Sequence, residues 1–141
     1  YVVCNWPESS RQYVDSGVGM TMFPAAPASQ VIAVQALSEA LPGVRVSTKI
    51  PDPRPIEHVV VSRIGSARPE FGTSMPRFLV EVYAGSEVAG ERLAEQVHSA
   101  WLSLVSHGIN LTASDWNLQP FDSPDPNHVR FQFTGGLQIF L

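Results

Sequence analysis

Histidines are the residues of this chain best suited to hold a metal ion or to transfer a proton near neutral pH. The four histidines are His58, His98, His107 and His128. They do not form the HxxH, HxH or HExxH spacings that bring two imidazoles onto one ion, and the acidic residues near them are not at ligand intervals. His98 lies beside an apolar helical stripe, and His58 lies within a predicted strand. We therefore expect structural histidines, with no metal and no cofactor.

Three glutamates, Glu87, Glu91 and Glu95, recur at four-residue spacing and would share one face of a helix. Such a row resembles a carboxylate site. Arg92 lies among the glutamates, however, and a row of mixed charge is typical of a solvated helix face. We interpret these side chains as solvent-facing.

The possible nucleophiles lack the surroundings that catalysis needs. Ser86 follows Ala84 and Gly85 without the closing glycine of a GxSxG elbow, so we expect it to cap a helix. Cys4 is the only cysteine, which excludes an intrachain disulfide and a cysteine metal cluster. No GKS or GKT phosphate-binding sequence occurs. The sequence predicts no catalytic residue, and we do not expect an enzyme.

Composition favours one domain that associates with other proteins. A chain of 141 residues has the size of a single domain. It is 44% hydrophobic and only 16% charged, which suggests that part of its surface is covered by oligomerisation. The net charge of −4 argues against a broad basic face for nucleic acid. Lys49 is the only lysine among nine basic residues, and arginines favour bidentate contacts at interfaces. No apolar run approaches the roughly 20 residues that a membrane-spanning helix needs.

The stretch 76–108 organises the predicted fold. Alternating apolar residues from Phe78 to Ala84 predict a strand, because side chains of a strand alternate between its two faces. After Ser86, apolar residues recur at three- and four-residue spacing and predict a long amphipathic helix. Its stripe contains Ala89, Leu93, Val97, Ala100, Trp101, Leu104 and Val105. Gly108 is the expected left-handed stop of this helix.

The remaining elements are predicted from shorter patterns of periodicity and turn chemistry. The helix over 29–41 begins at Ser29 as its expected cap. The other predicted segments are a strand over 44–50, a stiff proline-rich connection over 51–55, a strand over 56–64, a projecting loop over 65–76, a strand over 109–121 carrying Trp116, a turn over 123–127, and a strand from His128 that Gly135 and Gly136 break or bulge.

These elements predict an α+β fold. We expect a mainly antiparallel sheet of four to five strands, with two helices packed on one face. Residues 1–28 show no sustained period and are too apolar for a purely disordered tail, so we expect an extended N-terminal arm on its own or a neighbour's surface. The alternative is a short strand or loop that completes the domain's own core. Residues 29–141 form the single domain.

The segment LPGVRVSTKIPDPRPIEHVVVSRIGSARPEFGTSMPRFLVEVYAGSEVAGERLAEQVHSAWLSL resembles the tail terminator, or tail completion, proteins of long-tailed bacteriophages, especially those of actinobacteria. The signal is an ordered series of strand, proline loop, strand, long loop, strand and helix. The residues that carry it are Val44, Val46, Pro51 to Pro55, Val59 to Arg63, Gly65, Phe78 to Ala84, Ser86, Glu87, Ala89, Leu93 and Ala94, with a weaker extension to Asp125, Pro126 and the strand from Arg130 to Leu137. The arm before residue 29 departs from the usual pattern.

The resemblance implies a structural virion protein that works in the neck of the particle and is assembled in the host cytoplasm. Such subunits form a ring, usually of six copies, that ends polymerisation of the tail tube and meets the connector of the head. The implied partners are other copies of the chain, the tail tube protein and the head connector protein. Genomic DNA would pass through the bore without specific binding, and an acidic bore would repel it.

Contacts with neighbouring subunits or with the tube are expected at the stiff connection, at the projecting loop and at exposed aromatic residues. Arginines that flank the loop are expected to meet protein carboxylates. The candidate interface residues are Arg54, Arg63, Arg68, Phe71, Arg77, Trp116 and Phe121.

Two alternatives remain open at this point. One is a head-closure or connector protein of the same neck region, which would contact the portal side. The other is a small oligomeric α+β enzyme or ligand-binding protein with a pocket between sheet and helices, lined by His58 or His98.

Overall fold

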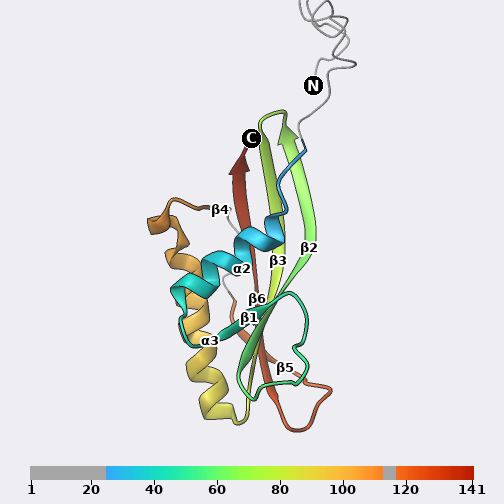
Figure 1. Cartoon of the computed structure of the whole chain (residues 1–141), viewed down its shortest axis with the longest axis vertical. Helices are drawn as coiled ribbons and strands as arrows, with labels where there is room; N and C mark the ends of the chain where they lie inside the picture. The colour runs from blue at the N-terminus through green and yellow to red at the C-terminus, as the bar shows by residue number, and fades with distance from the viewer. Residues whose placement is uncertain (1–24, 113–116) are drawn as a thin grey trace, which may run out of the picture.

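The computed structural model describes residues 25–112 and 117–141 (Figure 1). The predicted arm falls outside the described residues except for its last four positions, and Trp116 also lies outside them. Within these described residues the fold is α+β, with a mixed six-stranded sheet and two α-helices. Its elements in chain order are α2 Ser29–Ala40, β1 Arg45–Ser47, β2 His58–Glu70, β3 Thr73–Ala84, α3 Glu87–Leu102, the 3-10 helix η2 Ser103–His107, β4 Asn110–Thr112, β5 Gln119–Phe121 and β6 Val129–Phe140.

The sheet is mainly antiparallel, as predicted. Its strand order is β1-β2-β3-β6-β4, and β5 also pairs with β6. Among the strands of the described residues, only β1 and β2 pair in parallel. The sheet has six strands because the segment expected as one strand over 109–121 forms two short ones. These pair with different ends of the long β6, β4 with 136–138 and β5 with 130–132.

Both helices pack on one face of the sheet, which confirms that prediction. The core between them and the sheet contains Ala33 and Leu37 from α2, Leu93, Ala94, Val97 and Trp101 from α3, and Val59, Val61, Phe78, Val80, Val82 and Phe133 from the strands. Val59, Val60 and Val61 are all buried, so the centre of β2 is covered on both faces as expected. The face opposite the helices contains His58, Tyr83 and Arg130, which are register partners across three strands.

The helix ends agree with the sequence in part. Ser86 caps α3, since its hydroxyl accepts a hydrogen bond from the Ala89 N–H at 3.2 Å. Gly108 has φ +82° and ends η2 in the left-handed conformation. Ser29 is not the cap of α2; Ala28 is, and Ser29 is the buried first residue of the helix. Val105 was predicted in the buried stripe but is 58% exposed, because the change to 3-10 geometry at Ser103 shifts the phase of the side chains.

The predicted loop over 65–76 is wrong. β2 continues to Glu70 and β3 begins at Thr73, so only Phe71 and Gly72 form the turn of a long hairpin. Gly65 and Pro69 suggested a loop, but they lie where the β2–β3 register shifts, which is where bulges tolerate such residues. Gly135 and Gly136 likewise do not break β6, which runs without interruption to Phe140.

The strand predicted over 44–50 is also shorter than expected, because β1 ends at Ser47. The connection over 48–57 then returns to the start of β2, since two parallel strands need a crossover between them. The prolines at 51, 53 and 55 limit hydrogen bonding to a neighbouring strand in this stretch.

Candidate functional site

The structure divides the predicted interface residues between two ends of the sheet. Arg63, Arg68, Phe71 and Arg77 lie on the β2–β3 hairpin. The other two described residues, Arg54 and Phe121, lie at the opposite end, where the 48–57 connection and β5 approach the first residues of β6. The predicted set therefore does not form one patch.

The hairpin end extends past the helices. Figure 1 shows the upper ends of β2, β3 and β6 beyond both α2 and α3. The turn is held by a hydrogen bond from the Thr73 hydroxyl to the Glu70 carboxylate at 2.8 Å. Several large apolar side chains of this projection are exposed: Phe71 at 36%, Phe140 at 63% and Leu141 at 41%. A three-stranded ribbon with exposed apolar residues is a surface suited to contact another protein.

A polar cluster ties together the opposite end. Asp125 accepts a hydrogen bond from Arg54 at 3.1 Å and lies 2.9 Å from Nδ1 of His128. Nε2 of His128 and Nδ1 of His58 lie 3.0 Å and 3.1 Å from the carbonyl oxygen of Pro55. These contacts join the 48–57 connection to the 122–128 turn. Arg54 is therefore engaged within the subunit, in an ion pair that the spacing of the sequence did not indicate.

His58 is the most enclosed member of this cluster. It is fully buried, its ring stacks on Tyr83 with centroids 4.7 Å apart, and its Nε2 has no hydrogen-bond partner among the described residues. Burial is the main cause that lowers the pKa of His58 below its usual 6.5, and the nearby positive charge of Arg54 lowers it further. The neutral imidazole is thus the form that the folded protein favours, as in a structural histidine.

We expect His58→Phe to remove much of the pH dependence of stability below neutrality. Because the folded pKa is lowered, the unfolded state takes up the proton more readily, so stability is complete above about pH 6.5 and declines as pH falls toward the folded pKa. Phenylalanine keeps the stacked ring but cannot be protonated. Chemical denaturation at pH 7, 6 and 5 measures this slope. Equal slopes for wild type and His58→Phe would contradict the burial argument.

A second group of polar side chains extends along the face of the sheet opposite the helices. The carboxylate of Glu81 lies 2.8 Å from the Arg130 guanidinium and accepts a hydrogen bond from the Tyr83 hydroxyl at 2.9 Å. Burial, followed by this hydrogen bond, raises the pKa of Tyr83 to about 12. The Arg130 guanidinium also lies over the Phe121 ring, 4.8 Å from its centroid. Phe121 is still 51% exposed, so this predicted residue remains available on the surface.

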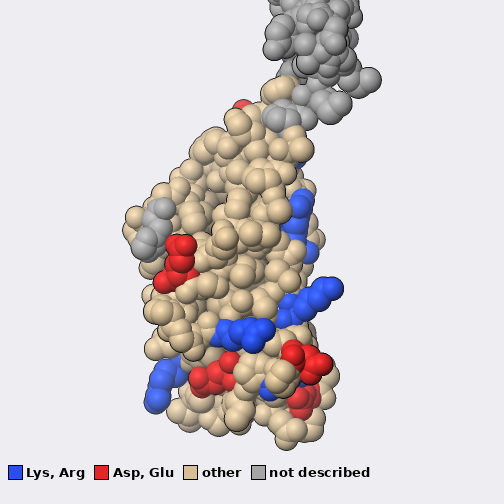
Figure 2. Space-filling model, in the orientation of Figure 1, with Lys and Arg blue, Asp and Glu red and all other residues tan. Residues whose placement is uncertain are grey.

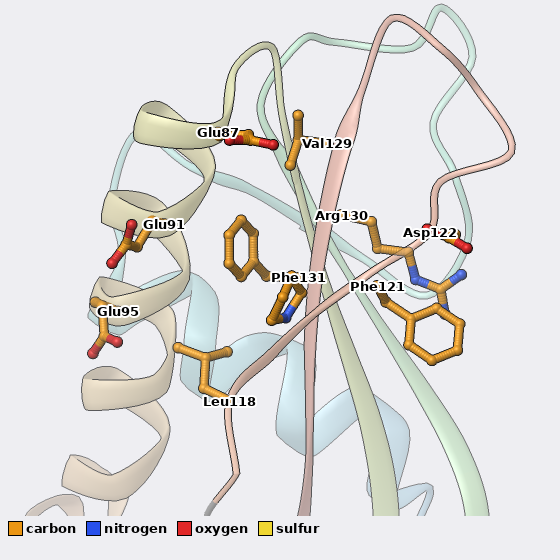
Figure 3. Close-up of a pocket in the computed structure, with 10 residues that line it drawn as sticks. Glu87, Glu91, Glu95, Leu118, Phe121, Asp122, Val129, Arg130 and Phe131 are labelled. Carbon is orange, nitrogen blue, oxygen red and sulfur yellow. The ribbon is translucent and has the colours of Figure 1, made fainter.

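A groove on the helix side runs between α3 and the chain that forms β5 and the start of β6 (Figure 3). It has a volume of about 650 Å³. Glu87, Glu91 and Glu95 of α3 line one side, and Phe131 lies between the helix and the strands. Gly90 permits this approach, since a Cβ there would lie 3.0 Å from the Phe131 ring. Figure 3 shows Arg130 and Phe121 on the other side of β6, away from the helix.

The groove combines an apolar floor with an acidic rim. Leu118, Val129 and Phe131 supply the apolar part and the three glutamates of α3 the acidic rim, whereas Asp122 lies with Arg130 and Phe121 on the other side of β6 (Figure 3). The three glutamates are exposed, and within 25–112 and 117–141 none of them has an ion-pair partner. The glutamates were predicted to face solvent, but the groove that they line was not predicted. The turn over 123–127, which returns the chain beside α3, was the signal that could have indicated it.

Acidic, histidine and cysteine side chains are not clustered as a metal site in the described part of the chain. No group of three or more His, Cys, Asp or Glu side chains there is arranged to hold a metal ion. No helix among the described residues has the length and apolar character to cross a membrane. No family model matches this chain. A comparison with curated proteins also found no match. The proposed function therefore rests on the residues of this chain and their geometry.

Proposed function

We propose that this chain is the structural subunit of a ring, with six copies as the expected number, at the head-proximal end of a bacteriophage tail tube. The ring would end polymerisation of the tube and join the tail to the head connector. The subunit would work in the neck of the virion without a cofactor or a catalytic step.

The sequence supports this proposal through the ordered series that resembles tail terminator proteins. The proline-rich connection over 51–55, the strand containing Val59 to Arg63 and the strand followed by a Ser86-capped helix stand in that order. The α+β architecture, with a sheet covered by helices on one face, is compatible with the small subunit that the resemblance implies.

The observation that carries the proposal is the projection of β2, β3 and β6 past α2 and α3. Phe71 in the turn of the hairpin is 36% exposed, and Phe140, which pairs with Thr73 beside that turn, is 63% exposed. On the face drawn in Figure 2, charged side chains lie mainly in the lower half and along the flanks, and the part above α2 has almost none. A surface with few charges and exposed apolar residues is typical of the centre of a protein interface.

The test is whether the purified protein forms a closed ring and whether that ring binds tail tubes. We expect electron microscopy and mass photometry to show rings, alone or after addition of tail tubes from a long-tailed actinobacteriophage. Phe140→Asp is expected to weaken binding of the ring to tail tubes by about tenfold or more, because a charge would be buried at the contact. Val105→Asp is the matched control, since Val105 is 58% exposed on η2, away from the projection.

The outcomes separate the proposed role from its alternatives. Rings that bind isolated tail tubes support the proposal. Rings that bind only head connectors would place the subunit on the other side of the neck. A protein that stays monomeric at all concentrations, with and without tubes, or that converts a small molecule, would overturn the proposal.

A further inference from the structure

The acidic groove is defined here as the surface formed by Glu87, Glu91 and Glu95 around Leu118, Val129 and Phe131. Its negative rim and apolar floor require a partner that is both basic and apolar. Charge of one sign around an uncovered apolar floor favours a complementary surface, because opposite potentials steer and align two proteins.

A second surface of the same chain has that complementary character. The basic edge is defined by Arg45 on β1, Lys49 after it and Arg63 on β2, all of which are exposed. Within the described ranges none of the three has an ion-pair partner. Two isoleucines adjacent to them in sequence, Ile50 and Ile64, are each 50% exposed. The edge therefore offers positive charge and apolar surface together.

The sheet order keeps the two surfaces apart within one subunit. β1 and β2 form one flank of the sheet, whereas β5 pairs with β6 on the other, with β3 between β2 and β6. The acidic groove lies beside β5 and β6, so it cannot reach the basic edge of its own chain. A copy that binds one neighbour through its groove still presents its edge to the next copy. Such a head-to-tail contact repeats and closes into a ring when the rotation permits.

We infer that the acidic groove of one copy binds the basic edge of the next copy. The glutamates of α3 meet Arg45 and Arg63, and the exposed isoleucines cover the floor around Phe131. Asp52 and Glu57 lie in the connection after Lys49 and are exposed, so the contact uses the part of the flank formed by β1 and the middle of β2. The inference rests on the proposed assembly into a ring and names the two surfaces that make it.

Charge reversal tests this pairing. The groove variant carries Glu91→Arg and Glu95→Arg, and the edge variant carries Arg45→Glu and Arg63→Glu. Each is expected to raise the concentration for half-assembly by about tenfold or more, measured by sedimentation velocity and mass photometry, because like charges then face each other. The variant with all four substitutions should recover assembly, since the signs are exchanged on both surfaces.

An equimolar mixture of the groove variant and the edge variant gives a sharper result. Alternating copies then place opposite charges at every contact, so the mixture is expected to assemble although neither variant does alone. The matched controls are Arg92→Glu, on α3 but outside the lining of the groove, and Arg77→Glu, on β3 next to the edge. Both should assemble as the wild type does, and circular dichroism of every variant reports whether it is folded.

Two failures are distinguishable. If the wild type forms rings and the folded groove and edge variants form them equally well, the pairing is wrong while the proposed ring stands. If the wild type never assembles, with or without tail tubes, both the pairing and the proposed function are overturned. A mixture that fails to recover assembly also rejects the pairing.

Discussion

Trp101→Ala is expected to lower the free energy of unfolding by about 3–5 kcal/mol, the usual cost of truncating a large buried aromatic residue. Trp101 is 2% exposed and joins α3 to the sheet. Its indole ring meets Phe78 and Phe133 edge-on, with centroids 5.9 Å and 6.2 Å apart. Removal of the ring would leave a cavity between the helix and two strands that neighbouring residues cannot refill.

Urea denaturation followed by circular dichroism measures this loss. Val88→Ala is the matched control, because Val88 lies on the same helix and is 69% exposed. We expect it to change stability by no more than about 0.5 kcal/mol. A Trp101→Ala variant as stable as that control would mean that α3 does not depend on this contact.

Gly135→Ala is expected to destabilise the fold by about 1–3 kcal/mol or more, although it adds only one methyl group to a strand. A Cβ at Gly135 would lie 2.3 Å from Nε1 and 2.5 Å from Cε2 of Trp101. The indole is enclosed by Phe78 and Phe133 and cannot move aside without disturbing the core. β6 would have to shift away from α3.

Gly65→Ala is the control for this substitution. Gly65 also lies in a strand, but a Cβ there would have no neighbour within 4 Å, and its φ is not in the left-handed region. We expect alanine at this position to be neutral or slightly stabilising, since it restricts the unfolded chain. In addition, Gly135→Ala combined with Trp101→Ala should cost less than the sum of the two, because the second change removes the clash. Additive losses would contradict the contact between them.

The long elements of the fold were predictable from the sequence, whereas its hairpin was not. The strand Phe78 to Ala84 and the helix after Ser86 have strong periodicity. Both begin and pack as predicted, although the helix changes to 3-10 geometry at Ser103, before its predicted stop at Gly108. The hairpin was missed because Gly65, Pro69 and Pro76 are local signals for a loop. Their tolerance in strands depends on register shifts in the β2–β3 pairing, which only the paired strands reveal.

The candidate surfaces were also predicted only in part, because they depend on contacts between segments that are far apart in the sequence. Arg63 and Arg77 were singled out as arginines next to a projection, and they do lie on the hairpin. Arg54 was included in that set, but its guanidinium pairs with Asp125, 71 positions later in the chain. The glutamates of α3 were correctly placed on an exposed helix face. Their position opposite Phe131 follows from how β5 and β6 pack beside α3, and local spacing carries no information on that.

The sequence alone determined the α+β class, the two helices on one face of the sheet and the apolar stripes of the core, because these follow from local periodicity and capping. The tertiary structure decided the length of the hairpin, the order of the strands and the separation of the acidic groove from the basic edge. Those features depend on which distant segments pair, and the free energy of such pairing is shared among residues that are far apart in the chain.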